Sequence, residues 1–253
     1  MASFSTRWTR RCLNKEMPRL ALIGYGKMGR MIEGLAPEYG CEVVARLDEH
    51  NNASGEGLKD RTLLGGADVA IEFSTPEAAV PNLEKLIALR VPVVVGTTGW
   101  LSQMDRIRAL VETNSAALVW SANFSVGVQV FLRAVHETSR WMSLQAEYGA
   151  WGWEIHHDTK KDAPSGTLLR IADEMRRAGY TRDVNLSSNR AGRHPGTHEI
   201  GFDSAADTIT LRHTARSREG FARGALQAAC WIPGKCGFFE FGEVLFGGKE
   251  GGA

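Results

Sequence analysis

Short apolar runs alternate with amphipathic stretches over the first half of the chain, and this alternation predicts strands separated by helices. The apolar runs have the length of buried parallel strands and end at glycine, proline or small polar residues. Strands are predicted at 18–23, 41–47, 66–73, 91–95 and 116–120, and helices at 30–36, 77–89 and 102–113. This order predicts an α/β fold with a doubly wound parallel sheet and right-handed crossovers.

The pattern changes beyond residue 124, where strand and helix no longer alternate. Apolar positions at helical spacing predict one long amphipathic helix over 126–142. Further strands are predicted at 151–156, 185–188 and 208–213, a helix at 168–177, and a loop at 190–199. We therefore expect a second, α+β domain over 125–218, with a mixed or antiparallel sheet whose open face serves oligomer contacts.

The last part of the chain is expected to return to the first domain. An apolar stripe predicts a helix over 219–231, and an aromatic-rich terminal element follows at 238–245. The predicted first domain therefore combines residues 17–124 with residues 219–253.

Residues 1–16 form a basic segment with no acid before Glu16, as in some transit peptides. The segment lacks a long amphipathic pattern. This favours a disordered extension, or an upstream start codon with Met17 as the functional start.

Composition and charge narrow the classes of partner. The 253 residues carry a formal net charge of +1 and 43% of them are apolar, so nucleic acid and anionic membranes are not favoured partners. No apolar run reaches the roughly 18 residues of a membrane-spanning helix. Four cysteines form no Cys-x-x-Cys pair and are expected to be free thiols in the cytoplasm: Cys12, Cys41, Cys230 and Cys236.

A glycine-rich turn lies between the first predicted strand and the first predicted helix. Its pattern is Gly-x-Gly-x-x-Gly, and its members are Gly24, Tyr25, Gly26, Lys27, Met28 and Gly29. In this context the first glycine permits a tight turn, the second lets a pyrophosphate approach, and the third allows close helix–strand packing. The turn predicts a Rossmann-type domain that binds a nicotinamide dinucleotide.

The choice between NADH and NADPH is left open by three side chains. Asp48, at the end of the second predicted strand, is suited to the adenosine ribose hydroxyls, which favours NADH. Lys27 and Arg46 could instead attract the 2′-phosphate of NADPH.

Two small polar loops follow the fourth and fifth predicted strands. The first is Gly96-Thr97-Thr98-Gly99, and the second is Ser121-Ala122-Asn123-Phe124. Open α/β sheets bind ligands at the carboxyl ends of their strands, so both loops are candidate parts of the cofactor site.

One stretch of the second domain gathers most of the remaining candidate chemistry. It runs from Glu154 to Thr167 and reads Glu-Ile-His-His-Asp-Thr-Lys-Lys-Asp-Ala-Pro-Ser-Gly-Thr. Its imidazoles titrate near neutrality, and its lysines offer positive charge to an anion. Gly166 lies with Thr167 near the start of a predicted helix, a place suited to a carboxylate or phosphate. The alternative is a polar surface loop with two solvated histidines.

Metal binding is not expected from the histidines farther along the chain. His194 and His198 are four residues apart, but they lie in a predicted loop with Pro195 and Gly196 between them. Such a loop does not present two imidazoles as a helical metal-binding pair would.

The run His156-His157-x-x-Lys160-x-Asp162-Ala163-Pro164-Ser165-Gly166-Thr167 resembles the signature of the 4-hydroxy-tetrahydrodipicolinate reductase family. The resemblance extends over the chain from Met17 and includes the glycine turn, 73–77, 96–99, 123–128 and Gly234-Lys235. It implies an NADH- or NADPH-dependent reductase that acts on a cyclic dicarboxylate in the diaminopimelate route of lysine biosynthesis. In this family a hydride reaches a ring carbon conjugated with an imine, and an acid protonates the enamine product.

The resemblance also implies roles for individual residues. His156 matches the family's proton donor, and Lys160 matches a catalytic lysine that also holds a substrate carboxylate. The positions that match substrate-binding residues are His157, Gly166 and Thr167. Those that match the nicotinamide surroundings are Gly96, Thr97, Thr98, Ser121, Ala122, Asn123 and Phe124. Members of the family are typically homotetramers assembled through the substrate-domain sheets.

Two other functions are compatible with the residues alone. One is a different NAD(P)-dependent dehydrogenase on the same scaffold, and the other is a non-catalytic nucleotide-binding protein. The combination of His156 with Lys160 argues against both. The sequence leaves open which of these two side chains delivers the proton.

Overall fold

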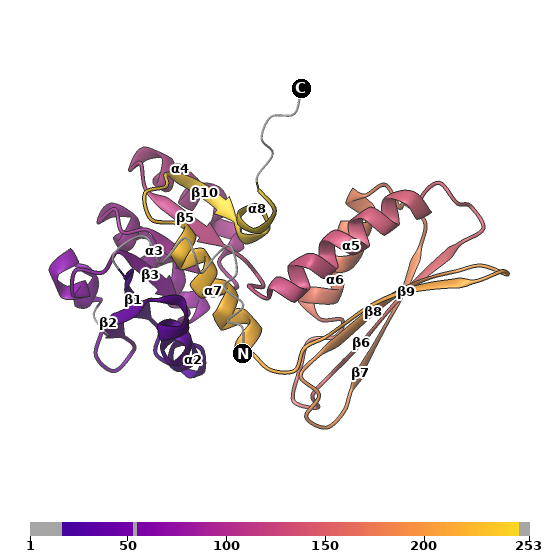
Figure 1. Ribbon diagram of the computed structural model, residues 1–253, viewed down its shortest axis with the longest axis horizontal. Helices are drawn as coiled ribbons and strands as arrows, with labels where there is room; N and C mark the ends of the chain where they lie inside the picture. The colour runs from indigo at the N-terminus through magenta and orange to yellow at the C-terminus, as the bar shows by residue number, and fades with distance from the viewer. Residues whose placement is uncertain (1–16, 53–54, 248–253) are drawn as a thin grey trace, which may run out of the picture. The chain divides into compact units, whose positions relative to one another are not determined.

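The computed structural model describes residues 17–52 and 55–247, and these fold into two compact units (Figure 1). The first unit contains the described residues up to Ser125 together with those from Phe221 onward, and the second is Val126–Gly220. The predicted extension at 1–16 lies outside the described residues. Among the described residues, no helix has the length and apolar character needed to cross a membrane.

The first unit is a six-stranded parallel sheet in the order β10-β5-β4-β3-β1-β2. Its strands are β1 (Arg19–Ile23), β2 (Glu42–Leu47), β3 (Val69–Glu72), β4 (Val93–Val95), β5 (Ala117–Trp120) and β10 (Gly237–Glu240). Its α-helices are α2 (Lys27–Leu35), α3 (Pro76–Ala88), α4 (Met104–Thr113), α7 (Glu219–Trp231) and α8 (Phe241–Phe246). Short 3-10 turns occur at η1 (Ala36–Tyr39), η2 (Glu56–Leu58), η3 (Arg61–Leu64) and η4 (Leu101–Gln103).

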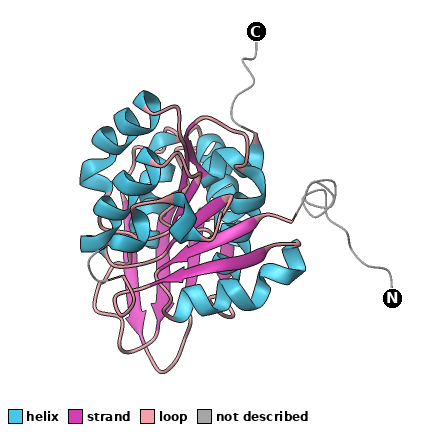
Figure 2. Cartoon of the chain, turned by 90° about the vertical axis from the view of Figure 1, so that its left-hand side faces the viewer, coloured by secondary structure: helices cyan, strands magenta, loops and turns pink. Residues whose placement is uncertain are grey.

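Helices lie on both faces of this sheet, which explains why its inner strands read as continuous apolar runs (Figure 2). Residues of β3 and β4 are fully buried. Leu83 and Leu86 of α3 and Ile107 of α4 pack into the same core cluster. The α3 helix starts as its sequence predicts, because the Thr75 side chain accepts a hydrogen bond from the Ala78 N–H and Pro76 occupies the first turn.

Two details of the first unit differ from the prediction. The α2 helix begins at Lys27 and not at Arg30, so the last part of the glycine turn is already helical. The terminal element contributes β10, which pairs in parallel with β5 as a sixth strand. A strand added to a sheet edge from the far end of the chain depends on a partner that local sequence does not show.

The second unit is a four-stranded mixed sheet covered by two helices. The strand order is β7-β6-β8-β9, with β6 and β7 parallel and the other pairs antiparallel. Its elements are α5 (Val126–Met142), β6 (Gly149–His156), α6 (Gly166–Arg177), β7 (Val184–Arg190), β8 (Thr197–Asp203) and β9 (Thr208–Thr214). The α/β fold with a second α+β domain is therefore confirmed.

The predicted loop at 190–199 is wrong at its carboxyl end, because β8 starts at Thr197. Its first residues, Thr197, His198 and Glu199, are polar and show no alternation that would indicate a strand. They are nevertheless paired on both sides, with β6 and with β9, so the ladder of neighbouring strands makes them β-structure.

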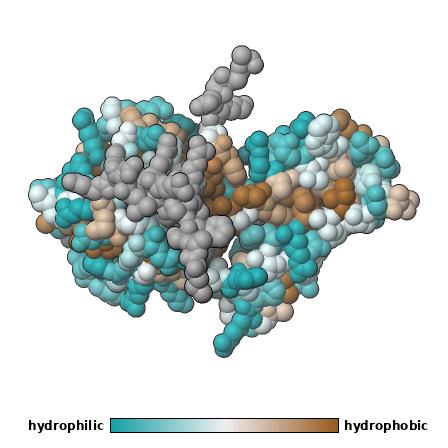
Figure 3. All heavy atoms as spheres, in the orientation of Figure 1, coloured by the Kyte–Doolittle hydropathy of each residue, from teal (hydrophilic) through white to brown (hydrophobic). Residues whose placement is uncertain are grey.

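One face of this sheet packs against α5 and α6, and the other is open. Val135, Ile171, Ile200 and Phe202 are fully buried between the helices and the sheet. On the opposite face, the ring of Trp151 lies over Gly201, where a Cβ atom would come within 2.1 Å of it. Hydrophobic atoms are also visible over the α5 region of this unit (Figure 3), and α5 carries two large exposed apolar residues, Val130 and Trp141.

Candidate active site

The glycine turn of the first unit is shaped by its own backbone contacts. Gly24 has φ +94°, and a Cβ there would lie 2.1 Å from the carbonyl oxygen of Phe73. A Cβ on Gly29 would lie 2.4 Å from the carbonyl oxygen of Gly24. Both positions therefore require glycine for the close packing of turn, strand and helix.

Gly26 is different, because a Cβ built there meets no protein atom within 4 Å. It is the N-cap of α2, and no side chain caps the first turn of this helix. The space above Gly26 and the uncapped N–H groups of α2, which begins with Lys27 and Met28, fit a pyrophosphate. The residues present therefore match a bound dinucleotide.

The side chains beside this turn form a small polar cluster. The Tyr25 hydroxyl donates to Glu33, and Arg46 Nε donates to Glu33 Oε1 at 2.7 Å. These hydrogen bonds lower the pKa of Glu33, with the larger effect from Arg46. The guanidinium of Arg46 is thus engaged with a carboxylate, whereas the Lys27 side chain is exposed.

Asp48 follows directly after β2, at the edge where the sheet binds nucleotides. Its Oδ1 accepts hydrogen bonds from the N–H groups of His50, at 2.9 Å, and Asn51, at 3.2 Å. Asp48 therefore holds its own turn as well as presenting a carboxylate near the position that a ribose would take.

The loops that follow β4 and β5 line one small hollow of the first unit. Residues that line it include Thr97, Thr98, Trp100, Ser121 and Ala122. The loops are internally bonded, since Trp100 Nε1 donates to the Thr97 carbonyl and Ser121 Oγ donates to the Asn123 carbonyl. The structure thus brings together two loops that lie more than 20 residues apart in the sequence.

Two of the predicted cofactor residues have little freedom to contact a ligand through side-chain atoms. Phe124 is 2% exposed, and its ring centroid lies 4.8 Å from that of Phe241 in the core. Gly96 has no side chain, and a Cβ there would collide with the Phe73 ring at 2.1 Å. Any contact from these two positions to a nucleotide therefore goes through the backbone.

In the second unit, strand pairing gathers a cluster of polar side chains on the helix-covered face of the sheet. Glu154 of β6 is paired with Ser188 of β7 on one side and with His198 of β8 on the other. His156, two residues further along β6, is paired with Arg190. Residues two apart on a strand share a face, so all five side chains converge.

Glu154 lies at the centre of this cluster and is fully buried. Its Oε1 accepts hydrogen bonds from Ser165 N, Ser188 Oγ and Arg190 Nη2, at 2.8, 2.9 and 2.9 Å. Its Oε2 accepts a hydrogen bond from Ser165 Oγ. Burial raises the pKa of Glu154, but the hydrogen bonds from Ser165 and Arg190 outweigh burial and lower the pKa to about 2.

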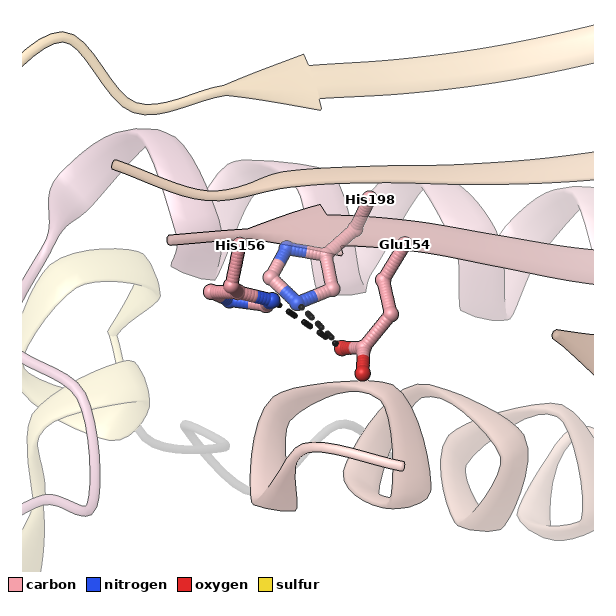
Figure 4. Close-up of side chains that lie close together, drawn as sticks. All are labelled: Glu154, His156 and His198. Atoms are coloured by element: carbon pink, nitrogen blue, oxygen red, sulfur yellow. Dashed lines mark ion pairs between the residues drawn. The ribbon is translucent and has the colours of Figure 1, made fainter. Parts of the chain in front are cut away.

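Two imidazoles face the same carboxylate oxygen (Figure 4). His156 Nδ1 lies 3.5 Å from Glu154 Oε2, and His198 Nε2 lies 3.4 Å from it. Burial lowers the pKa of His156, and the negative charge of Glu154 opposes this shift. Burial and the neighbouring His156 lower the pKa of His198 to about 4, so that His198 is neutral near neutral pH.

The loop between β6 and α6 holds the remaining residues of the predicted motif. Lys160 Nζ donates to both carboxylate oxygens of Asp162, at 2.7 and 2.9 Å. The Gly166 N–H, in the first turn of α6, also interacts with the Asp162 carboxylate, and Lys160 is the larger cause of the lowered pKa of Asp162. An anion at this point therefore meets a lysine and a helix N-terminus together. The His157 ring contacts the Thr159 hydroxyl at 2.7 Å.

The start of α6 is open to a ligand. Ser165 caps the helix by accepting a hydrogen bond from the Leu168 N–H. Gly166 is exposed, and a Cβ there would meet no atom within 4 Å. Thr167, the next residue, is half-buried.

The spacing of Glu154, His156 and His198 would also suit a metal ion, since one ligand atom from each lies within 4.8 Å of the others. The Arg190 guanidinium on the same carboxylate places a positive charge beside that point, which disfavours a second cation. His194 and His198 were not expected to form a metal-binding pair, and the structure pairs His198 with Glu154 of β6.

Four members of the cluster were not predicted as site residues: Glu154, Ser188, Arg190 and His198. Glu154 lies two residues before His156, and this spacing was the available signal because it places both side chains on one face of a strand. The contributions of Arg190 and His198 depend on the register of β7 and β8, which the sequence does not show.

A glycine turn on a parallel sheet, together with a unit that presents imidazoles and a lysine, is the arrangement of a pyridine-nucleotide-dependent oxidoreductase. Residues 18–124 match the family described as dihydrodipicolinate reductase, N-terminus, and residues 127–245 match dihydrodipicolinate reductase, C-terminus. The chain therefore belongs to the dihydrodipicolinate reductase family. The family, fold class and enzyme class predicted from the sequence are confirmed.

Similar proteins cover nearly the whole chain. The 4-hydroxy-tetrahydrodipicolinate reductase of Christiangramia forsetii is 35% identical over 237 residues, which span 89% of this chain and 97% of the relative. That of Thiobacillus denitrificans is 32% identical, over 90% and 98% of the two chains. Among solved structures, a dipicolinate-bound dihydrodipicolinate reductase from Paenisporosarcina sp. TG-14 has a TM-score of 0.73 and 21% identity, over 88% of this chain and 97% of that chain. At this identity the structural likeness concerns the fold.

Proposed function

We propose that the protein reduces 4-hydroxy-tetrahydrodipicolinate, by way of dihydrodipicolinate, to tetrahydrodipicolinate in the diaminopimelate route of lysine biosynthesis. The observation that carries the proposal is the second unit's site, in which His156, Lys160 and the start of α6 lie within one continuous motif of a reductase-family chain. A different substrate of the same scaffold would not require this combination of acid, lysine and helix terminus.

The substrate is a cyclic dicarboxylate, and the second unit offers matching groups for its charges. Lys160 would bind one carboxylate, which takes the place of Asp162 at the ammonium group. The N–H groups of Gly166 and Thr167 at the start of α6 would hold the same carboxylate through hydrogen bonds and the helix dipole. His157 would contact the substrate from the other end of the loop.

His156 would deliver the proton that completes the reduction. Its Nδ1 faces Glu154 in the interior, so the other ring nitrogen, Nε2, is the atom available to a substrate. A proton donor beside the enamine that hydride addition leaves would increase the rate by protonating its ring carbon, and hydride and proton together give tetrahydrodipicolinate. Lys160 would bind and orient the substrate and lower the energy of negative charge that develops on it.

The cofactor would bind at the glycine turn, with Gly24 to Gly29 around the pyrophosphate and the loops at 96–98 and 121–124 around the nicotinamide end. Bound there, a reduced nicotinamide supplies the hydride. Asp48 would bind the adenosine ribose hydroxyls of NADH, and the exposed Lys27 would accommodate the additional phosphate of NADPH. We propose that both nucleotides serve as hydride donors.

The test is a coupled assay. Dihydrodipicolinate synthase would supply the substrate, and the oxidation of NADH or NADPH would be followed at about 340 nm. Folded protein that oxidises neither nucleotide under these conditions would refute the proposed reaction. A panel of amino-acid and aldehyde substrates in the same assay separates this reductase from another dehydrogenase, and nucleotide binding without turnover would indicate a binding protein.

We further propose that the protein is a cytoplasmic homotetramer. The open face of the second sheet supports this assembly, because Trp151 and Trp153 lie on the side opposite α5 and α6. Light scattering should give a particle mass of four times that of one chain. The Trp153→Glu variant should give a smaller particle mass, because the charge would disrupt the contact between chains. A monomer at micromolar concentration would refute this assembly.

A further inference from the structure

Glu154 is a buried anion with no part in the proposed chemistry, yet its contacts are arranged asymmetrically. Three donors converge on Oε1, from Ser165, Ser188 and Arg190. The other oxygen, Oε2, meets Ser165 Oγ and is the atom that faces the two imidazoles (Figure 4). A carboxylate whose first oxygen is saturated keeps its charge and directs the second oxygen toward the histidines.

We propose that Glu154 is a positioning residue for His156: through Oε2 it fixes the orientation of the His156 ring and supports the positive charge of that ring when it serves as proton donor. The inference rests on the proposed function, because it concerns the acid that the proposed reaction uses. His198 is the second imidazole that faces Oε2.

The orientation of the His156 ring follows from contacts at its two edges. Nδ1 is buried and has no hydrogen bond in the described part of the chain, but it lies 3.5 Å from Oε2. At the opposite edge, a Cβ on Gly196 would lie 3.0 Å from both Nε2 and Cδ2. The Nδ1 edge of the ring thus faces a carboxylate, whereas the Nε2 edge faces a glycine that carries no side chain. A proton on Nδ1 would shorten the contact with Oε2 into a charge-assisted hydrogen bond.

Charged and titratable groups from several elements act on the His156 imidazole. The groups that act on His156 are Glu154 on its own strand, Arg190 on β7, His198 on β8, and Lys160 with Asp162 in the following loop. Glu154 is the buried anion among them, while Lys160 and Arg190 oppose protonation. Burial lowers the pKa of both imidazoles, that of His198 to about 4, and the negative charge of Glu154 opposes the shift at His156.

The decisive variant is Glu154→Gln, which keeps the shape of the side chain and removes its charge. The His156 imidazole would be followed by NMR titration and assigned by its absence from a His156→Asn variant. We expect its titration midpoint to fall by about one pH unit or more, and turnover at pH 7 to fall about 10-fold or more. An unchanged midpoint together with an unchanged pH profile of kcat would overturn the inference.

Ser188→Ala is the matched control, because it removes one donor to Oε1 and leaves the carboxylate, Arg190 and both imidazoles in place. It should change the His156 midpoint by much less than Glu154→Gln does. If the two variants shift the midpoint equally, general disturbance of the cluster explains the effect and the charge on Glu154 does not.

Glu154→Gln leaves Arg190 without its carboxylate partner, so a second variant covers the case in which it does not fold. Glu154→Asp retains the charge and withdraws the carboxylate by one methylene. In this variant the titration midpoint of His156 should stay close to that of the wild type. The value of kcat should fall, with KM little changed, because the ring is less well oriented. Wild-type kcat and KM in this variant would overturn the orienting role.

The two levels of the proposal fail separately. If wild-type protein shows no reductase activity, the proposed function is wrong, and the NMR titration still tests whether Glu154 controls His156. If wild-type protein is active but Glu154→Gln matches it in midpoint and pH profile, the function stands and the positioning role is refuted.

Discussion

The first unit shapes its candidate site with backbone atoms, whereas the second unit builds its site from charged side chains. Around the glycine turn, the close contacts are between Gly24, Gly29 and neighbouring carbonyl oxygens. Around Glu154, they are hydrogen bonds and ion pairs between side chains from three strands and a helix cap. The first arrangement leaves space for a ligand beside Gly26, and the second holds a buried carboxylate beside two imidazoles.

Because of this difference, the two sites should be sensitive to different kinds of substitution. A backbone site tolerates changes of surrounding side chains but not an added Cβ, because space and N–H direction define it. A buried side-chain cluster depends most on its charged members, because loss of one charged partner leaves another unpaired in a medium of low dielectric. Replacements in each unit should therefore affect different steps of the reaction.

The largest effect is expected from His156→Ala. Turnover should fall about 10²–10⁴-fold, the range typical for loss of a general acid, while dinucleotide affinity stays near that of the wild type. Steady-state kinetics and a fluorescence titration with NADH would measure the two quantities. Weakened nucleotide binding with normal turnover would contradict both the assigned role and the separation between the units.

A pair of glycine variants tests the backbone site. Gly24→Ala should destabilise the first unit by at least about 1–3 kcal/mol, because alanine is strained at φ +94° and its Cβ would strike the Phe73 carbonyl oxygen. Gly26→Ala should alter the free energy of unfolding by less than about 0.5 kcal/mol, since its Cβ meets no protein atom.

Gly26→Ala should nevertheless weaken dinucleotide binding, about 10-fold or more, because the methyl group occupies the space for the pyrophosphate. Denaturant unfolding and calorimetric titration would separate the two variants. Equal losses of stability, or unchanged affinity in Gly26→Ala, would show that the turn does not work as the geometry indicates.

Acidification should lower the stability of the second unit through protonation of His198. The folded protein lowers the pKa of this imidazole from 6.5 to about 4, so on acidification the unfolded chain takes up the proton first. The stability that depends on neutral His198 is complete above pH 6.5 and is lost between pH 6.5 and 4, on the order of 3 kcal/mol.

Hydrogen exchange of backbone amides between pH 7 and pH 4.5 would locate that loss. After correction for the intrinsic pH dependence, protection in β6 and β8 should decrease more than protection in β1 and β3. His198→Asn should make the decrease smaller. Equal decreases in the two sheets, with no effect of the variant, would rule out His198 as the cause.

The smallest effect concerns cofactor choice in the first unit. Asp48→Ala should weaken NADH binding about 10-fold and NADPH binding less, because the proposed contact of this carboxylate is with ribose hydroxyls that NADPH presents only in part. Because Asp48 also accepts N–H bonds from His50 and Asn51, Asp48→Asn provides a control that retains the turn. Equal losses for the two nucleotides in both variants would show that Asp48 does not select between them.

Much of the first unit could be predicted from sequence because its determinants are local. The apolar runs predict buried strands, Thr75 with Pro76 predicts the start of α3, and the glycine spacing predicts the nucleotide turn. The position of β10 at the sheet edge could not be predicted, because its partner β5 lies more than 100 residues earlier in the chain.

The site of the second unit also has one part that the sequence predicts and one part that it does not. The sequence by itself determined the motif from His156 to Thr167, since these residues are consecutive and Ser165 is a residue type that favours the start of a helix. Only the tertiary structure decided that Glu154, Arg190 and His198 surround His156. The physical reason is strand register: a shift of one residue in β7 or β8 would turn Arg190 or His198 to the opposite face of the sheet and leave Glu154 without its partners.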